Sequence, residues 1–271
     1  MAGALGSAAT TGSATAAASN RTRGDFMWST SGGLGQANRR ILQWVMALPD
    51  LHAGSPVQAA RAWAHSARFL VTASRLPELP EQGPPEIAFV GRSNAGKSSA
   101  INALAQHKRL AFASKTPGRT QHINLFCVGP RDAPDATWVD LPGYGFAAVE
   151  RESKKRWQAV VADYLTQRHN LAGLVMLVDA RHGFTDLDRQ LLGYVWPRLA
   201  NGDVKLLVLL TKADKVSRRD AQRVLGLAQR VLAEVATEHS DIGVTLFSAV
   251  SGQGLDDVVL TLRSWAKLHS T

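Results

Sequence analysis

Residues 91–98 read G-R-S-N-A-G-K-S and fit the pattern G-x-x-x-x-G-K-[ST]. In such a stretch the glycines let the backbone curl, so that several N–H groups point at one anion. Lys97 would supply a full positive charge to the β- and γ-phosphates of a nucleotide, and the Ser98 hydroxyl would ligate Mg²⁺. A glycine-containing turn with a surface lysine is the alternative. Because all four fixed positions match, the stretch predicts a site that holds a nucleoside triphosphate by its phosphates.

A second stretch could hold the metal ion and sense the third phosphate. D-L-P-G, from Asp140 to Gly143, fits D-x-x-G and lies about 40 residues after the glycine-rich stretch, directly behind an apolar run. The carboxylate could hold Mg²⁺ through water, and the glycine N–H could reach the γ-phosphate. Asp179, Asp186 and Asp188 compete for this role, but none of them is followed by glycine three residues later.

The choice of base is predicted further along the chain. T-K-A-D, from Thr211 to Asp214, fits [NT]-K-x-D. The Asp214 carboxylate can accept both the N1–H and the exocyclic N2–H of guanine, a pair of donors that adenine cannot offer. The aliphatic stem of Lys212 can cover the flat base. F-S-A, ending at Ala249, resembles the loop whose alanine N–H meets guanine O6. A solvated surface pair of Lys212 and Asp214 is the alternative.

Residues 114–121 read S-K-T-P-G-R-T-Q and lie between the phosphate motif and the D-L-P-G stretch. A polar loop with Pro-Gly is ordinarily only a turn. In this setting it is interpreted as the first switch, which orders when the γ-phosphate is present and relaxes after hydrolysis. Thr120 is the better candidate for a second hydroxyl on Mg²⁺, because Pro117 constrains Thr116.

These motifs need strands and helices to bring them together. Apolar runs of strand length alternate with helical patterns from residue 85 onward, as expected for parallel strands covered on both faces. The expected strands are 86–90, 123–128, 137–140, 174–179, 205–211 and 244–247. The expected helices are 99–104, 153–168, 186–199, 218–236 and 255–268. The pattern predicts an α/β fold with a six-stranded, mostly parallel sheet, helices on both faces, and a ligand site at the carboxyl ends of the strands.

The first 24 residues are mostly Ala, Gly, Ser and Thr. Such a segment cannot bury enough apolar surface to offset its ordering entropy, and it lacks the apolar region of a secretory signal. A disordered extension is the first interpretation. An organellar transit peptide is a second, and a true start at Met27 or Met46 is a third.

Weak helical periodicity follows over residues 36–75, for example at Trp63, Ala67 and Leu70. A proline-rich linker then leads into the first strand. The expected division of the chain is a disordered or weakly helical N-terminal extension over 1–65 and a nucleotide-binding domain over 66–271.

The composition limits the partners and the compartment. The chain has 271 residues and a net charge of +9, which favours a polyanionic partner. The single Cys127 cannot form an intramolecular disulfide, which favours a reducing compartment. No apolar run approaches the ~18 residues of a membrane span. We therefore expect a cytoplasmic, monomeric protein without a membrane partner.

Taken together, GRSNAGKSSAINAL, SKTPGRTQ, DLPGYGFA, TKADK and FSA make the chain resemble the EngB/YihA/YsxC family of bacterial ribosome-assembly GTPases, within the translation-factor class. The resemblance covers roughly residues 66–269, and the N-terminal extension departs from it. It implies a P-loop GTPase fold, GTP and GDP binding with Mg²⁺, maturation of the large ribosomal subunit, and a link to cell division and septation. Lys97, Thr120 and Gly143 are the expected catalytic residues. Mg²⁺ is expected on Ser98 and Thr120, with Asp140 through water. The residues expected at GTP are Gly91, Arg92, Ser93, Asn94, Ala95, Gly96, Lys97, Ser98, Gly118, Arg119, Thr120, Gln121, His122, Asp140, Leu141, Pro142, Gly143, Thr211, Lys212, Ala213, Asp214, Phe247, Ser248 and Ala249.

Two residues refine the expected mechanism. Tyr144 stands where Ras-like proteins place a water-orienting glutamine, and a phenol cannot position water as a carboxamide does. We therefore expect slow intrinsic hydrolysis, no faster than the roughly 10⁻⁴ s⁻¹ of unassisted Ras. Asn94 stands where potassium-activated GTPases, by resemblance, carry a cation-ligating asparagine. It either ligates K⁺, which would supply the charge of an arginine finger, or only hydrogen-bonds within its own loop. Arg119 as a finger in cis is a weaker candidate.

Basic residues surround the predicted first switch and follow the loop that begins at D-L-P-G, which is interpreted as the second switch. They suggest binding to ribosomal RNA coupled to GTP. They are Lys108, Arg109, Lys115 and Arg119, then Arg151, Lys154, Lys155 and Arg156. The expected partner is a large ribosomal subunit precursor, with its RNA and proteins. One alternative is a division-site GTP-binding protein with no direct ribosome role. Another is a metabolic P-loop enzyme, in which Asp214 would have no function.

Overall fold

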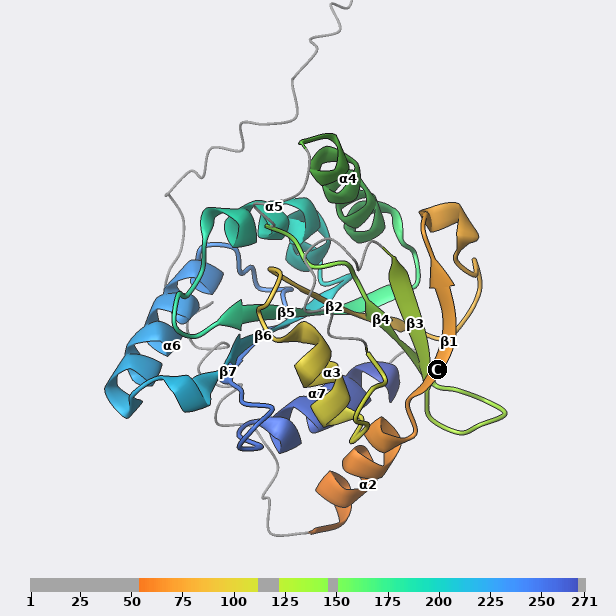
Figure 1. The fold of residues 1–271 in the computed structure, drawn as a ribbon, viewed down its shortest axis with the longest axis horizontal. Helices are drawn as coiled ribbons and strands as arrows, with labels where there is room; N and C mark the ends of the chain where they lie inside the picture. The colour runs from red at the N-terminus through yellow and green to blue at the C-terminus, as the bar shows by residue number, and fades with distance from the viewer. Residues whose placement is uncertain (1–53, 112–121, 146–150, 268–271) are drawn as a thin grey trace, which may run out of the picture. The chain divides into compact units, whose positions relative to one another are not determined.

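The computed structural model describes residues 54–111, 122–145 and 151–267 (Figure 1). Its centre is a seven-stranded sheet in the order β1-β3-β4-β2-β5-β6-β7. The strands are β1 (Arg68–Ala73), β2 (Glu86–Gly91), β3 (Ile123–Val128), β4 (Ala136–Asp140), β5 (Leu171–Asp179), β6 (Lys205–Thr211) and β7 (Ile242–Leu246). β4, β2, β5, β6 and β7 run parallel, whereas β3 is antiparallel to β4 and β1 is antiparallel to β3.

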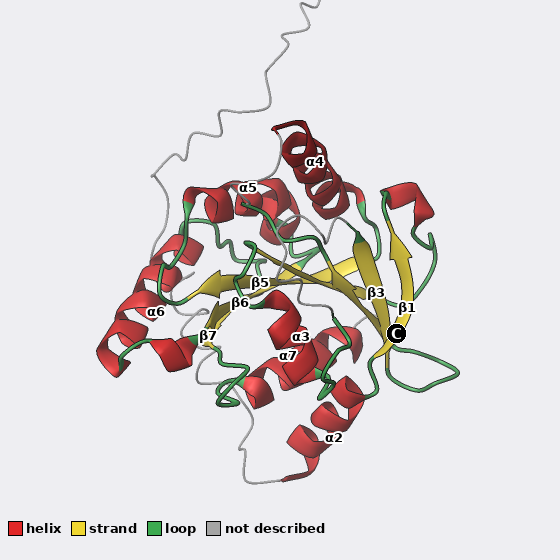
Figure 2. Cartoon of the chain, in the orientation of Figure 1, coloured by secondary structure: helices red, strands yellow, loops and turns green. Residues whose placement is uncertain are grey.

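Helices cover both faces of the sheet, which is why its central strands are almost continuously apolar (Figure 2). The helices are α2 (Gly54–His65), α3 (Lys97–Leu104), α4 (Arg151–Gln167), α5 (Asp186–Ala200), α6 (Arg218–Ala233) and α7 (Leu255–Lys267). One hydrophobic cluster joins the sheet to α4, α5 and α6, and a second joins it to α2, α3 and α7. Within the described residues, none of the helices is at once long and apolar enough to cross a bilayer.

The predicted α/β class and mostly parallel sheet are confirmed, but the predicted count of six strands is wrong by one. The additional strand is β1, whose residues lie within the range 36–75 that is predicted to be weakly helical. Its register with β3 shifts between Phe69 and Val71, and Phe69 and Leu70 are both exposed, at 59% and 45%. A bulge of this kind interrupts the two-residue alternation by which a half-buried strand is recognised. Within the described residues, the helical prediction is therefore confirmed for Gly54–His65 only.

Helix α2 packs against the domain through a pair of tryptophans. Trp63 lies edge-on to Trp138 of β4, with ring centroids 5.9 Å apart, and its Nε1–H donates to Asp135 Oδ1 at 2.6 Å. Arg61 also pairs with Asp256 of α7 at 2.5 Å. The predicted boundary at residue 65 thus falls at the end of a helix whose buried face belongs to the second hydrophobic cluster.

Candidate functional site

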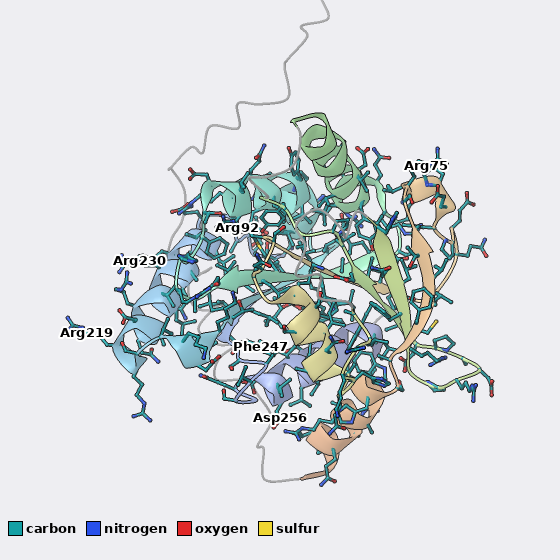
Figure 3. The ribbon with its side chains drawn as sticks, in the orientation of Figure 1. Arg75, Arg92, Arg219, Arg230, Phe247 and Asp256 are labelled. Carbon is teal, nitrogen blue, oxygen red and sulfur yellow. The ribbon has the colours of Figure 1, made fainter. Side chains whose placement is uncertain are left out.

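Four of the predicted motifs lie at one edge of the sheet. The phosphate motif follows β2, D-L-P-G follows β4, T-K-A-D overlaps the end of β6, and F-S-A follows β7. Because these four strands are parallel, their carboxyl ends meet at the same edge, where open α/β sheets bind ligands. Arg92, which follows β2, and Phe247, which follows β7, are labelled in Figure 3.

The phosphate motif forms a loop that closes onto a helix N-terminus. Gly91 passes so close to β5 that a Cβ there would lie 2.8 Å from the carbonyl oxygen of Leu177. Gly96 has φ +96°, a left-handed conformation that favours glycine, and it is the N-cap of α3. The first N–H groups of a helix have no intrahelical partner. The loop therefore offers backbone donors and the positive end of the α3 dipole to an anion.

Lys97 and Asp140 form a buried ion pair between the phosphate motif and the end of β4. Lys97 Nζ donates to Asp140 Oδ1, and the two side chains are 8% and 1% exposed. A charge buried this deeply requires a partner, so each group holds the other in place. The pair brings together the expected phosphate-binding ammonium and the expected metal-binding carboxylate.

The oxygen donors present fit Mg²⁺. The ion prefers hard oxygen ligands and is usually held by one or two protein groups together with substrate phosphates. Ser98 in the first turn of α3 and Asp140 at the end of β4 are donors of this class. In the part of the chain that the structure describes, no three His, Cys, Asp or Glu side chains gather as a metal cage. Ser98 and Asp140 are thus the described residues that would hold a metal ion arriving with a nucleotide.

Tyr144 is anchored at two points on the phosphate motif and at one point on α5. Its N–H donates to Gly91 O at 3.2 Å, and its carbonyl accepts from Ser93 N–H at 2.7 Å. Its hydroxyl donates to Asp188 Oδ1 of α5 at 2.6 Å, and the side chain is 4% exposed. Burial, and then the neighbouring Asp188, raise the pKa of the phenol well above its usual value. The phenol is thus a protonated donor committed to α5.

Asp188 is a site-supporting residue that sequence reasoning considered only as a rival metal ligand. It is 1% exposed, and its Oδ2 accepts from the Thr185 N–H at 2.7 Å and from Thr185 Oγ1 at 2.6 Å. T-x-x-D before an apolar helix is the sequence signature of a capping box, so the start of α5 could have been predicted. The bond to Tyr144 spans 44 residues and leaves no such local signature.

Thr211 and Lys212 tie the base-recognition motif to the phosphate motif. Lys212 Nζ donates to Asn94 O at 2.6 Å and to Asp179 Oδ2 at 2.8 Å. Thr211 Oγ1 donates to Ala95 O at 2.6 Å. Burial alone would raise the pKa of Asp179, but hydrogen bonds from Arg181 and Lys212 outweigh it and hold the pKa well below its usual range. Asn94 itself is exposed and has φ 66°.

Asp214 is oriented by the loop after β7. Ser248, which is fully buried, donates through Oγ to Asp214 Oδ1 at 2.6 Å. The same Oγ accepts from the N–H groups of Val250 and Ser251, at 3.2 and 3.1 Å. The bond from Ser248 is the main cause that lowers the pKa of Asp214. The carboxylate is therefore ionised and held in one orientation, as a bidentate acceptor for guanine requires.

A cavity of about 150 Å³ lies behind the phosphate motif, between it and the segment after β5. Arg92, Ser93 and Asp188 are among the residues that line it. The Arg92 Nε and Ser93 Oγ atoms are buried there without a hydrogen-bond partner among the described residues. The cavity is thus polar and adjoins the contact between Tyr144 and α5.

Several residues that the sequence predicts at the site lie outside the described part of the chain, and others are exposed on its surface. Gly118, Arg119, Thr120 and Gln121 lie outside the described residues, as do Thr116 and Lys115 and the side chains of Arg151, Lys154, Lys155 and Arg156. Lys108 and Arg109 are exposed. His122 is exposed near the end of β1, with its Nδ1 2.9 Å from Ser74 Oγ. The roles of these residues stay predictions.

Known proteins with similar sequences and folds agree with this geometry. A family model described as 50S ribosome-binding GTPase matches residues 86–212. The chain is 52% identical over 207 residues to the probable GTP-binding protein EngB of Albidiferax ferrireducens, covering 76% of this chain and 96% of that protein. It is also 52% identical over 204 residues to the probable GTP-binding protein EngB of Acidovorax ebreus, covering 75% and 90%.

Two solved structures share the fold. The crystal structure of a probable GTP-binding protein EngB has a TM-score of 0.52 at 21% identity, covering 68% of this chain and 99% of that chain. The crystal structure of Era in complex with MgGDPNP and nucleotides 1506–1542 of 16S ribosomal RNA has a TM-score of 0.52 at 19% identity, covering 67% and 56%. At these identities the likeness concerns the fold alone.

Proposed function

The chain belongs to the EngB family of GTP-binding proteins, and from this premise we propose that it is a slow GTP-operated switch in the assembly of the large ribosomal subunit. GTP binding and GTPase activity follow from family membership. The slow rate, the ribosomal role and the link to cell division and septation are the proposal.

One contact supports the GTP-binding part of this function most directly, the bond from Lys212 Nζ to Asn94 O at 2.6 Å. It fixes the base-recognition motif against the phosphate motif. A ligand held by both must have a guanine at one end and a phosphate chain at the other. A nucleotide kinase or ATPase would give Asp214 no such role.

In this arrangement different groups of the chain would bind different parts of the nucleotide. Backbone N–H groups before α3 and the Lys97 ammonium hold the phosphates, and the Asp214 carboxylate selects the base. Mg²⁺ would be held by Ser98, with Asp140 through water, and would neutralise negative charge on the phosphates. The Gly143 N–H would reach the γ-phosphate and so sense whether it is present.

The slow rate is supported by the position of Tyr144. Its hydroxyl is bonded to Asp188, and the side chain cannot act as a water-orienting carboxamide does. Intrinsic hydrolysis is therefore expected to await a partner or a cation. Asn94 as a K⁺ ligand and Asn94 as a loop residue both stay open, and equal hydrolysis rates in K⁺ and Na⁺ would favour the second.

The ribosomal role is supported by the description of the matching family model and by the net charge of +9. The proposed partner is a large-subunit precursor in the cytoplasm. A division-site GTP-binding protein without a direct ribosome role is the competing function. Nucleotide would then leave the affinity for ribosomal particles unchanged.

The Asp214→Asn variant tests the choice of base. The new side chain has an amide N–H₂ where one carboxylate oxygen accepted, so guanine loses an acceptor. We expect GDP affinity to fall at least about 100-fold, because an unpaired buried donor discriminates strongly. Affinity for xanthosine diphosphate, which has a carbonyl in place of the amino group, should rise. Isothermal titration calorimetry measures both. Adenine nucleotides bound by the unaltered protein as tightly as guanine nucleotides would contradict the proposal.

Replacing Lys97 with alanine tests the coupling to ribosomes. We expect GTP binding to be lost, together with nucleotide-dependent co-sedimentation with large-subunit precursors. Because Asp140 would be left without its partner, the Asp214→Asn variant serves as a second nucleotide-deficient protein with an intact ion pair. Lost nucleotide binding with unchanged sedimentation in both variants would reject the coupling.

A further inference from the structure

Helix α6 presents an arginine face that the nucleotide site does not use. Its inner face packs on the sheet through Ala221, Val224, Ala228, Val231 and Leu232. Away from this face α6 exposes Arg219, Arg223 and Arg230, and its first residue, Arg218, is exposed beside them; the four are hereafter the α6 arginine face. Figure 3 shows Arg219 and Arg230 projecting away from the helix.

Two of these arginines lie at the N-terminus of the helix, where the helix dipole disfavours a positive charge. Arg218 and Arg219 are the first two residues of α6, next to the N-cap Ser217. The N-terminus of a helix carries partial positive charge, so cations there are unfavourable and acidic residues are preferred. Only Asp220 in this turn is acidic. Departures from such local rules are expected at functional sites, where another requirement overrides them.

Few carboxylates pair with the arginines of the α6 arginine face. Arg223 lies 3.7 Å from Asp220, and both side chains are more than half exposed, so this pair is weak. Arg218, Arg219 and Arg230 have no carboxylate of the described residues within ion-pair distance. The charge is therefore available to a partner.

We propose that the α6 arginine face binds backbone phosphates of large-subunit RNA, an inference that rests on the proposed ribosomal function. Twelve residues at about 1.5 Å each give a row of about 18 Å from Arg218 to Arg230. That length spans several phosphates of one duplex strand, at about 3.4 Å of axis each. Guanidinium groups match phosphate oxygens bidentately. An anionic membrane is disfavoured because the apolar face of α6 is already buried against the sheet.

This contact is independent of the bound nucleotide. In the sequence the predicted switches precede β3 and follow β4, and α6 connects β6 to β7, which lie at the other end of the sheet order (Figure 1). The α6 arginine face is thus an anchor that acts in both nucleotide states. The nucleotide-dependent part of the affinity belongs to the switches.

The test replaces Arg218, Arg219 and Arg230 with glutamine in the full chain, because glutamine has a helix propensity close to that of arginine. The control variant, Arg75→Gln, Arg131→Gln and Lys267→Gln, removes the same charge from exposed sites on other elements. The probe is deproteinised large-subunit ribosomal RNA. Binding is measured between about 50 and 200 mM salt with GDP and with a non-hydrolysable GTP analogue.

We expect the α6 variant to bind RNA at least tenfold more weakly in both nucleotide states, with a salt slope smaller by about 2 to 3. The control variant should change affinity less than twofold. GTP hydrolysis and GDP affinity should be unchanged in both. The melting temperature of the α6 variant should be equal to or higher than that of the unaltered protein, since two cations leave the helix N-terminus.

Equal losses in the two variants would show that only total charge matters, and would overturn the inference. Unchanged RNA affinity in the α6 variant would overturn it as well. So would a defect confined to anionic vesicles or to an acidic protein. If the unaltered protein binds neither this RNA nor large-subunit precursors in either nucleotide state, the proposed function itself fails.

Discussion

Each carboxylate at the nucleotide edge is held by a different partner. Asp140 is paired with the Lys97 ammonium, Asp214 accepts from Ser248, and Asp188 accepts from Tyr144. The partner of each carboxylate determines what that carboxylate can do. The Asp140 charge is balanced by an ammonium, the pKa of Asp214 is lowered by its hydrogen bond, and Asp188 holds Tyr144 against α5.

Replacing Tyr144 with phenylalanine separates anchoring from chemistry. Asp188 would lose one of three donors, so we expect the free energy of unfolding to fall by about 1–3 kcal/mol. Single-turnover GTP hydrolysis should stay within about twofold, because the hydroxyl is bonded to α5. Urea denaturation and a single-turnover assay measure the two effects. Tyr194→Phe, on the surface of α5, is the matched control. A tenfold change in hydrolysis at unchanged stability would place the phenol in the chemistry.

Helix α4 is fixed to the sheet at its C-terminal end. The Tyr164 hydroxyl donates to Glu86 Oε2 at 2.7 Å, and Arg168 donates to both Glu86 oxygens, at 2.9 and 2.6 Å. Glu86 begins β2, the strand that leads into the phosphate motif. The C-terminal end of α4 is therefore anchored at the start of β2, the strand that leads into the phosphate motif.

Strand β6 begins with a lysine that the fold does not satisfy. Lys205 Nζ is buried without a hydrogen-bond partner among the described residues. Burial lowers the pKa of this ammonium below its usual value, with Asp241 acting in the opposite direction. The charged form is thus less favourable in the folded protein than in the unfolded chain.

Replacing Lys205 with methionine should stabilise the protein. At neutral pH we expect the free energy of unfolding to rise by about 1 kcal/mol and Tm by about 2–4 °C. Between the lowered pKa and the unperturbed value of 10.5, the unfolded chain binds more protons than the folded protein. Stability of the unaltered protein therefore rises with pH in this window, and the advantage of the variant should shrink toward pH 10.5. Lys108→Met, at an exposed site, is the control. A destabilised Lys205→Met variant would contradict this account.

The whole molecule combines a strongly basic charge with a ligand site confined to one edge of its sheet. The net charge is +9, and basic side chains lie both beside the predicted switches and on α6. A basic protein attracts any polyanion. Selective binding of the proposed ribosomal partner would therefore require that some of the affinity depend on the nucleotide.

The salt dependence of binding tests this coupling between nucleotide and affinity for the whole molecule. We expect affinity for large-subunit particles to fall steeply between about 50 and 200 mM salt, because bound phosphates release counterions. At each salt concentration the affinity should differ between GTP and GDP. Sedimentation with labelled protein measures both effects. A flat salt response, or equal affinity with the two nucleotides, would contradict the proposed coupling to ribosomal RNA.

Local patterns were enough to predict the central strands and the four motifs at the sheet edge. The predicted strand limits 123–128 and 205–211 agree with β3 and β6 to the residue, because each is an apolar run that ends at a change of composition. Strand β1 was missed because its bulge and its exposed Phe69 and Leu70 hide the alternation. The predicted site residues between 112 and 121 lie outside the described part of the chain, so their roles stay predictions.

By itself, the sequence determined which chemistry the chain carries, because a phosphate loop, a D-x-x-G turn and a T-K-x-D turn are defined by residues a few positions apart. Only the tertiary structure decided how these parts are held. Lys212 bonds to Asn94, Tyr144 to Asp188 and Glu86 to Arg168 across 118, 44 and 82 residues. Contacts of that separation depend on the order of strands in the sheet, and no local pattern encodes them.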